Sequence, residues 1–418
     1  MSVSLLQQIE RFEAYFEKRE PQVLAFLPEG GRFERLRREA QCLMDGLAPN
    51  AGRPPLFGVL VGVKDVIHVE GLPTRAGSQL PPEVLAGPEA ECITRLKRAG
   101  ALVLGKAHTS EFAYSAPTPT RNPHHPEHTP GGSSSGSAAA VAAGLCPIAI
   151  GTQTTGSIIR PAAFCGVVGF KPSYGRIPMS GVIPLAPSID HLGFFTTNVM
   201  DAIRIASLLC DAWQPHDLPR PKPVLGIPLG PYLDHASQEG QAHFEAVCQH
   251  LARLGFDVVS VPAMPDFEAI AARHNLLLRA EAALVHAEWF TDFGAWYHPQ
   301  TAAMIRDGRH VSASSLSQAR EGREQLRSEL LALMDGFGLD LWLSPAAPGP
   351  APRGLDYTGD AIMNLPWTHS GLPALNLPAG TNLDGLPLGL QVTARWYADE
   401  ELLSWGLTLE QALRGIPE

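Results

Sequence analysis

The sequence predicts a large α/β protein in which helices cover both faces of a central sheet. Residues 58–63 form a short apolar run between turn formers, which is typical of a buried strand. Residues 92–104 and 244–261 each have the pattern of a helix, then a glycine, then a strand. A glycine commonly follows the last residue of a helix, and strands that alternate with helices form a sheet with two covered faces.

The other elements follow in order along the chain. The first 48 residues are rich in charge and have helical periodicity, best seen at 33–40, which predicts surface helices. Ser137 leads into small apolar residues at 138–143, which predict a buried helix. The later expected elements are strands at 224–228 and 339–343 and a helix at 276–290.

Charge and composition exclude several classes of protein. The 418 residues include 32 Lys and Arg against 42 Asp and Glu, for a net charge of −10. An acidic chain without a block of basic residues is a poor candidate for binding nucleic acid or an anionic membrane. With 45% apolar and 18% charged residues, it can bury a large core. The longest apolar run, 138–150, is interrupted by Gly144 and Pro147 and is too short to span a membrane.

The cysteines and the N-terminus predict a cytoplasmic protein. None of the six cysteines belongs to a Cys-x-x-Cys pair, so neither a zinc ribbon nor a disulfide framework is expected. Glu10 and Arg11 precede any apolar segment, which argues against a signal peptide.

The chain is expected to form one domain over residues 1–418. The proline-rich segment 215–223 is the best candidate for a boundary, but the patterns before and after it are alike, which favours a connection inside one domain. The expected parts are an N-terminal helical segment at 1–48, a core at 58–200 and the remainder of the same domain at 224–418. A second proline-rich segment at 344–353 predicts a loop after a strand.

The most unusual segment, 129–144, combines glycines and serines with a run of alanines. A flexible linker would not run directly into an apolar helix, and a phosphate-binding loop would end in Gly-Lys-Ser/Thr. Residues 132–136 match Gly-x-Ser-x-Gly with Ser134 at the centre. A nucleophile elbow requires a strand before it, and 122–130, with three prolines and three histidines, does not fit one.

A second segment of small residues, 151–172, makes a family resemblance specific. Val63-Lys64-Asp65, Gly132-Ser133 and Gly156-Ser157, in this order and spacing, resemble the amidase signature family of serine hydrolases, with malonamidase-like amidases the nearest in motif. The resemblance covers most of the chain. It implies a single α/β domain with a mixed central sheet, and no metal or organic cofactor. The further matching pieces are 105–106, 181–184, 371–380 and 385–391.

The resemblance implies a proton relay between three side chains. Ser157 would be the nucleophile, Ser133 the bridging serine after a cis peptide bond from Gly132, and Lys64 the base. A lysine accepts a proton only when it is neutral, so we expect burial without a close carboxylate to lower its pKa. Asp65 is expected to point away from Lys64, because successive side chains of a strand alternate.

The resemblance also implies an oxyanion hole of backbone N–H groups, and two residues there depart from the family. Gln153 stands where many relatives have Asp, and we hypothesise that its neutral side chain keeps Lys64 neutral or tolerates an anionic substrate; the alternative is a structural hydrogen bond. Thr155 stands where Gly is usual and adds a branched side chain that puts close substrate approach in doubt. The implied donors are the backbone N–H groups of Thr154, Thr155, Gly156 and Ser157.

A third departure is Arg160, three residues after Ser157, where many relatives have the arginine two residues after. A malonamate-type amidase of the family has it at three, where it meets the substrate carboxylate. A guanidinium fits a carboxylate through two parallel hydrogen bonds. We hypothesise a small amide substrate with an acid group; the alternative is a structural ion pair. Ser134 and Thr152 are expected to support the site with their hydroxyls or to cap turns.

Other reactive side chains are assigned structural roles. His124, His125 and His128 lack helical ligand spacing, so no metal site is expected. Cys165 is expected to be a packed thiol. The segment 367–370 either approaches the pocket or packs in the core.

These observations predict an amidase that hydrolyses a small-molecule amide through an acyl-serine intermediate. We expect no cofactor, no nucleic acid and no membrane, and a homodimer is left open. Three alternatives remain open: the amidase (glutaminase) subunit of a tRNA-dependent amidotransferase, a hydrolase of ureides such as allophanate, and a catalytically silent scaffold.

Overall fold

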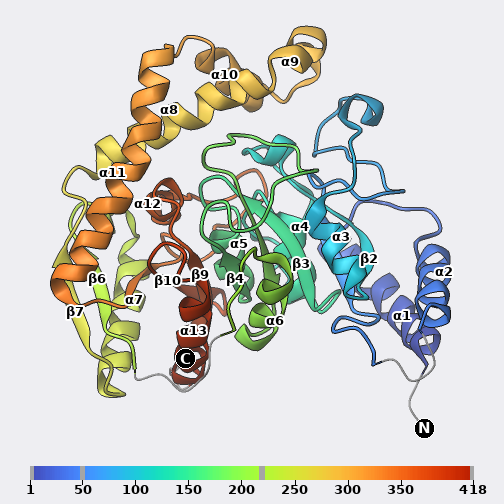
Figure 1. Ribbon diagram of the computed structural model, residues 1–418, viewed down its shortest axis with the longest axis horizontal. Coiled ribbons are helices and arrows are strands. Elements are labelled where there is room, and N and C mark those ends of the chain that lie inside the picture. Colours follow the sequence, from blue (N-terminus) through green and yellow to red (C-terminus); the bar gives the residue numbers. More distant parts are fainter. Residues whose placement is uncertain (1–3, 48–51, 216–221, 415–418) are drawn as a thin grey trace.

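Ten strands form one mixed sheet in the order β2-β1-β3-β5-β4-β9-β10-β8-β6-β7 (Figure 1). The computed structural model describes residues 4–47, 52–215 and 222–414. The strands are Leu60–Lys64 (β1), Leu102–Ala107 (β2), Ile148–Gln153 (β3), Val168–Lys171 (β4), His191–Thr196 (β5), Leu225–Leu229 (β6), Val258–Pro262 (β7), Leu341–Pro345 (β8), Ala374–Thr381 (β9) and Pro387–Thr393 (β10).

The sheet is parallel at its two ends and antiparallel in its middle. Strand β1 pairs in parallel with β2 and β3, and β6 pairs in parallel with β7 and β8. The five pairs between β3 and β8 are all antiparallel. Strands from both halves of the sequence share this sheet, so the molecule is a single α/β domain with a mixed sheet, as the family resemblance implied.

Helices cover both faces of the sheet. Ile148 and Ile150 of β3 belong to the hydrophobic cluster of α3, α6, α7 and α13, whereas Ala149 between them belongs to the cluster of α1, α2 and α4. This alternation is what a strand buried on both faces requires. In the described part of the chain the α-helices are Leu5–Val23 (α1), Arg32–Asp45 (α2), Glu91–Arg98 (α3), Ser135–Ala142 (α4), Ile159–Cys165 (α5), Val199–Leu209 (α6), Gln238–Arg253 (α7), Phe267–Val285 (α8), Ala287–Phe293 (α9), Pro299–Gly308 (α10), Ala313–Phe337 (α11), Leu365–His369 (α12) and Asp399–Leu413 (α13).

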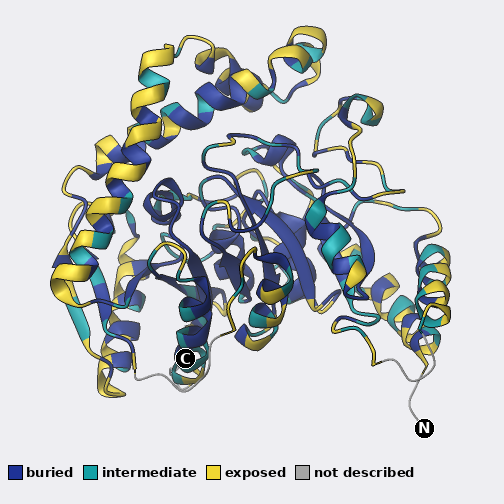
Figure 2. Ribbon diagram, viewed as in Figure 1, coloured by how far each residue is buried: buried dark blue, intermediate teal, exposed yellow. Residues whose placement is uncertain are grey.

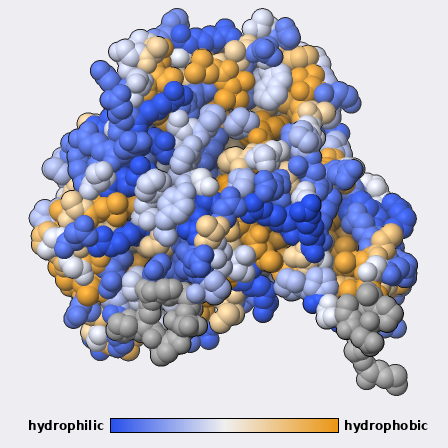
Figure 3. All heavy atoms as spheres, in the orientation of Figure 1, coloured by the Kyte–Doolittle hydropathy of each residue, from blue (hydrophilic) through white to orange (hydrophobic). Residues whose placement is uncertain are grey.

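Helices α8 to α11 form a helical arm at one end of the sheet, and their outer surfaces are exposed (Figures 1 and 2). Leu284 and Trp296 of this arm are among the exposed large hydrophobic residues, and hydrophobic surface is visible at the top of Figure 3. The inner side of α8 faces the domain and contributes side chains to the cavity described below.

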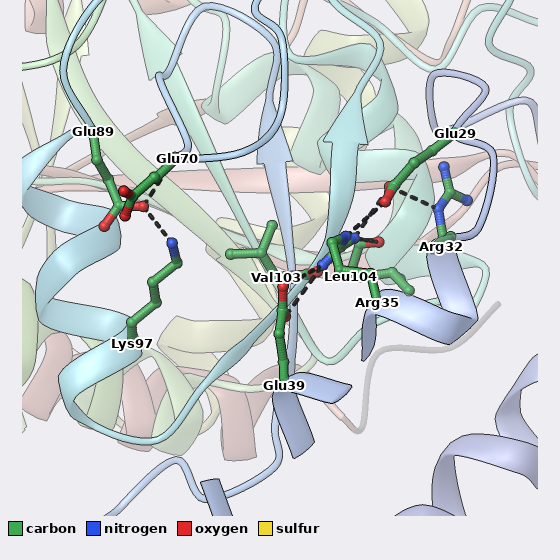
Figure 4. Close-up of polar contacts among 9 residues, drawn as sticks. All are labelled: Glu29, Arg32, Arg35, Glu39, Glu70, Glu89, Lys97, Val103 and Leu104. Carbon is green, nitrogen blue, oxygen red and sulfur yellow. Dashed lines mark hydrogen bonds and ion pairs between the residues drawn. The ribbon is translucent and has the colours of Figure 1, made fainter. Parts of the chain in front are cut away.

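The N-terminal helices cover the edge strand β2. Arg35 of α2 donates to the backbone carbonyls of Val103 and Leu104 at 2.9 and 3.2 Å, and Glu29 holds the same guanidinium at 2.7 Å (Figure 4). Carbonyls that an edge strand would leave unpaired are therefore bound by a side chain, which blocks pairing with another strand. Figure 4 also shows Glu89 binding Lys97 beside this edge.

The structure confirms most of the predicted elements and corrects two of them. The strand expected at 256–261 begins only at Val258. Gly255 adopts a φ of +80°, and the N–H of Phe256 donates to the Leu251 carbonyl, so Phe256 still belongs to the end of the preceding helix. The helix expected at 276–290 is two helices that meet at His286. Of the proline-rich segment 215–223, residues 216–221 lie outside the described part of the chain. In the described residues, no helix has the length and apolarity that crossing a membrane requires.

Candidate active site

Lys64 is the last residue of β1 and lies beside the end of the parallel strand β3. Its side chain is fully buried. The amine Nζ lies 2.8 Å from both Ser133 Oγ and Thr152 Oγ1, and 3.3 Å from the Thr152 carbonyl oxygen. The pairing of Val63 with Ile150 brings Lys64 next to Thr152, at the carboxyl edge of the two strands where sheet proteins commonly hold ligands.

The surroundings of Lys64 disfavour its charged form. Burial lowers the pKa of Lys64 well below its ordinary value; the negative charge of Asp190 opposes this shift, and the positive charge of Arg160 adds to it. Within the described residues, no carboxylate makes an ion pair with Lys64. Its sequence neighbour Asp65 pairs instead with Lys106 at 2.8 Å. Burial and the absence of a paired carboxylate are the conditions that we expected from the sequence for a neutral lysine.

Ser133 reaches Lys64 because α4 packs closely against the sheet. Helix α4 consists of serine, glycine, alanine and valine, and a Cβ at Gly136 would overlap the carbonyl of Ala25. Ser134 and Ser137 donate to the β3 carbonyls of Thr152 and Ile150 at 3.1 and 2.9 Å. The helix is thus fixed on β3, with Ser133 just before it. The peptide bond between Gly132 and Ser133 is cis, as the resemblance implied.

Ser157 lies in the loop between β3 and α5 and lines a cavity of about 230 Å³. Ser133 is fully buried and does not line this cavity. Among the described residues, no hydrogen bond joins the Ser157 hydroxyl to Ser133 or to another side chain. The structure therefore contains the contact between Lys64 and Ser133, and Ser157 lines the cavity without a side-chain partner among the described residues.

The loop before Ser157 presents backbone N–H groups. Within the described residues, those of Thr155, Gly156 and Ser157 donate to no other group. Position 156 requires glycine, because a Cβ there would overlap Asn364 Oδ1. These free donors next to Ser157 have the character of an oxyanion hole.

Asp190 holds the start of this loop in place. The Thr154 hydroxyl donates to Asp190 Oδ1 at 2.6 Å, and Asp190 Oδ2 accepts from the backbone of Leu185 at 2.8 Å. The antiparallel pairing of Gln153 with His191 brings Asp190 opposite Thr154. Asp190 was not predicted from the sequence, because only the register between β3 and β5 connects it to the site.

Gln153 performs the structural role that was the alternative expected from the sequence. Its Oε1 accepts from the backbone N–H groups of Ile158 and Ile159 at 2.7 and 2.9 Å, at the start of α5. Its Nε2 donates to Thr368 Oγ1 at 2.9 Å. Gln153 does not contact Lys64, so any effect on the lysine would act through the absence of a charge.

Arg160 of α5 lines the cavity and is 5% exposed. Its guanidinium donates to the carbonyl of Gly359, to the carbonyl of Gly132 at 2.5 Å and to Thr358 Oγ1 at 3.4 Å. Nε is buried without a partner among the described residues. Burial lowers the pKa of Arg160 to about 10, and the electrostatic effects of Tyr357 and Asp360 oppose this shift.

No described carboxylate lies within ion-pair distance of Arg160. The structural ion pair that was the alternative for this residue is therefore not formed. A buried guanidinium that binds only neutral oxygens retains an uncompensated charge, which is costly unless an anion joins it.

Several residues of the cavity wall could not be identified from the sequence. Asn275 and Leu278 of α8 and the loop 357–362 line it together with Ser157. Trp367 and His369 are fully buried in α12 and do not line this cavity.

The cysteine and the histidines near the serine loop have structural partners. Cys165 is fully buried, and burial raises the pKa of its thiol. His124 and His128 bind the backbone carbonyls of Cys165 and Ala351 at 2.9 and 2.8 Å.

Known proteins resemble this chain over nearly its whole length. The family model for Amidase matches residues 31–403. A glutamyl-tRNA(Gln) amidotransferase subunit from Thermus thermophilus is 35% identical, and the match covers 98% of this chain and 94% of that protein. The corresponding protein of a Synechococcus species is 32% identical with the same coverage.

Solved structures agree with this family. A crystal structure of an amidase superposes with a TM-score of 0.86 at 34% identity, covering 97% of this chain and 95% of that one. A peptide amidase bound to the competitive inhibitor chymostatin gives a TM-score of 0.81 at 25% identity, covering 99% and 95%. Because the family model spans most of the chain and relatives above 30% identity cover nearly all of it, the protein belongs to the amidase signature family of amide-cleaving enzymes.

Proposed function

We propose that this protein hydrolyses a small amide that carries a carboxylate close to the amide, through an acyl-enzyme formed on Ser157. Lys64 acts as the base and Ser133 as the relay between the two. The observation that carries the proposal is the buried Lys64 amine, which has only hydroxyl and carbonyl partners and lies 2.8 Å from Ser133 Oγ.

The proposed reaction proceeds in two balanced steps. In the first, Ser157 Oγ attacks the amide carbonyl, while its proton passes to Ser133 and the Ser133 proton passes to neutral Lys64. The backbone N–H groups beside Ser157 bind the oxygen that becomes negative. The proton returns along the same path to the amide nitrogen as its bond to carbon breaks. In the second step, water attacks the acyl-serine along the same relay and releases the acid.

Arg160 supports an acid group on the substrate. Its guanidinium reaches the carbonyl of Gly132, the residue bonded to Ser133. A carboxylate bound at Arg160 therefore lies near the reacting serines, which favours a dicarboxylic monoamide with one or two carbons between its two carbonyl groups. The α-carboxylate of glutamine is separated from its amide carbon by three carbons, so glutamine is expected to be a poorer substrate.

Labelling of the nucleophile is the first test of the proposal, and steady-state kinetics is the second. A fluorophosphonate should label Ser157 in the wild type and not in Ser157→Ala. A screen of neutral and acidic amides and ureides, read by ammonia release, should then give the highest kcat/KM for short acidic amides. A wild-type protein that is neither labelled nor active would contradict the enzymatic assignment and leave the scaffold alternative.

The role of Arg160 has its own controls. Arg160→Ala should raise KM sharply for acidic amides and leave neutral amides little changed, and Arg160→Gln keeps N–H donors for Gly132 without the charge. An equal loss for neutral amides would count against carboxylate recognition.

A second candidate is the glutaminase subunit of a tRNA-dependent amidotransferase, which the similarity to the two amidotransferase proteins favours. Glutaminase activity together with a second chain that co-purifies stoichiometrically would support this function. Activity on short acidic amides by the chain alone would favour the first candidate.

A further inference from the structure

The side chain of Thr155, one of the departures from the family pattern, is held by a histidine of the helical arm. Thr155 Oγ1 lies 3.0 Å from Nε2 of His274, which is a fully buried residue of α8. The Thr155 side chain is only partly buried, and the residue lines the same cavity as Ser157.

The protonation of His274 follows from its burial and its partners. Burial lowers the pKa of His274 to about 3, so at neutral pH the ring is uncharged and carries one hydrogen. Nδ1 has no hydrogen-bond partner among the described residues. A buried N–H group without an acceptor is more costly and rarer than a buried acceptor without a donor. The hydrogen is therefore assigned to Nε2, which donates it to Thr155 Oγ1.

This assignment leaves the hydroxyl hydrogen of Thr155 uncommitted. With His274 as the donor, Thr155 Oγ1 acts as the acceptor, and no other described residue accepts from it. We propose that the Thr155 hydroxyl donates a hydrogen bond to an oxygen of the bound substrate, and that His274 is the positioning residue that orients it. This inference rests on the proposed function, because it assigns a further substrate contact to the same cavity.

The backbone of Thr155 is fixed as firmly as its side chain. The Thr368 hydroxyl donates to the Thr155 carbonyl at 2.6 Å and accepts from Gln153 Nε2 at 2.9 Å. Both departures in the loop, Gln153 and Thr155, thus join one hydrogen-bonded chain. A β-branched side chain on a fixed backbone has few rotamers, so the direction of the Thr155 hydroxyl is well defined.

The expected ligand is an amide with a second oxygen acceptor besides the scissile carbonyl. A glycine at this position would lack such a donor. A Thr155 hydroxyl that binds substrate should therefore affect discrimination between substrates with and without that oxygen more than it affects folding.

Substitutions at both residues test the inference on the best amide from the screen. Thr155→Val removes the hydroxyl with little change in shape and should lower kcat/KM about three- to tenfold, mainly through KM, as for the loss of one hydrogen bond. Thr155→Ser should retain activity. His274→Phe should reproduce the loss, and the double variant should lose no more than either single variant, because the two residues act as one unit. His274→Gln, which offers an N–H donor, should recover part of the activity.

A histidine elsewhere at the end of α8 provides the matched control. His286 is also fully buried and also has one bonded nitrogen, at 3.0 Å from the Tyr297 hydroxyl. His286→Phe should lower Tm and leave kcat/KM within about twofold, the scatter expected away from a binding contact.

Two results would overturn the inference. One is a kcat/KM of Thr155→Val within twofold of the wild type. The other is a double variant whose loss in kcat/KM equals the product of the losses of Thr155→Val and His274→Phe. If His274→Phe does not fold, the comparison of Val with Ser at position 155 decides alone. A wild type that hydrolyses no amide and resists fluorophosphonate would instead overturn the proposed function.

Discussion

Lys64 Nζ lies 2.8 Å from Ser133 Oγ, although the two residues are 69 positions apart in the sequence. Two packing relationships produce this contact: β1 lies beside β3, and α4 docks on β3 through its serine hydroxyls. The amine is left with oxygen partners that bear no full charge, and it can therefore exist without its proton at a pH where an exposed lysine cannot.

Lys64→Met should abolish amide hydrolysis, because it removes the proposed base and the partner of Ser133. General-base catalysis contributes about a hundredfold to ten-thousandfold, and a loss of at least this size in kcat/KM is expected. Lys64→Arg should be nearly as inactive, since a guanidinium cannot lose its proton near neutral pH. Residual activity within tenfold of the wild type in both variants would contradict the role of Lys64.

The pH dependence of the wild type follows from the lowered pKa of Lys64. The neutral amine is the active form, so kcat/KM should rise with pH and reach a plateau well below the ordinary lysine value of about 10.4. A profile that is still rising at pH 10 would show that the lysine remains protonated in the folded protein.

Gln153→Glu should raise the pH at which this plateau begins. The side chain of Thr152 contacts Lys64, and the substitution places a carboxylate on the next residue along the chain. A nearby negative charge favours the protonated amine. Oε1 can still accept from the start of α5, so the fold should be retained. An unchanged pH–rate profile in a folded variant would remove the idea that the neutral Gln153 helps to keep Lys64 neutral.

The residues proposed from the sequence for the candidate site lie in short contiguous motifs. Lys64, Ser133 and Ser157 could be named because each sits in a recognisable motif at a characteristic spacing. The carboxylate of Asp190 and the cavity loop 357–362 could not be named, since strand register and long-range docking place them.

The same distinction applies to the fold. The glycine after α3 correctly predicted where that helix ends, because Gly100 adopts a φ of +92° that other residues rarely adopt. The break between α8 and α9 was missed. At this break His286 packs against Phe112 and bonds to Tyr297, and no local sequence pattern reveals such contacts.

Gly156→Ala should both destabilise the protein and impair catalysis. The added Cβ would overlap Asn364 Oδ1, and Asn364 is held by bonds from its Nδ2 to Ala346 and Gln391, each 2.9 Å long. Overpacking of this kind costs about 1–3 kcal/mol, and the displaced loop should lower kcat as well. Thermal unfolding and steady-state kinetics measure the two effects.

Gly336→Ala is the matched control for this substitution. Gly336 lies in α11, and apart from the backbone of its own helix no atom of the described residues lies within 4 Å of an added Cβ. Alanine should therefore raise stability by up to about 1 kcal/mol through helix propensity and leave kcat unchanged. Equal stability of the two variants would contradict the steric argument for Gly156.

Lys171 should make the stability of the protein rise with pH above neutrality. Its side chain is fully buried with the amine bound to the Leu372 carbonyl at 2.5 Å, and burial lowers the pKa of Lys171 to about 7, against the negative charge of Asp399. Below that pH the lysine is protonated in both states and the full penalty of burying the charge applies. Between about 7 and the unfolded value near 10.4, only the unfolded chain holds the proton, so the free energy of unfolding should increase by up to about 1.4 kcal/mol per pH unit.

The variant Lys171→Met lacks this titration. Its loss of the contact with the Leu372 carbonyl should change the free energy of unfolding by the same amount at every pH. The difference in unfolding free energy between wild type and variant, measured with denaturant from pH 6 to 9, should therefore be flat below pH 7 and grow above it, whereas parallel curves would show that Lys171 keeps its ordinary pKa.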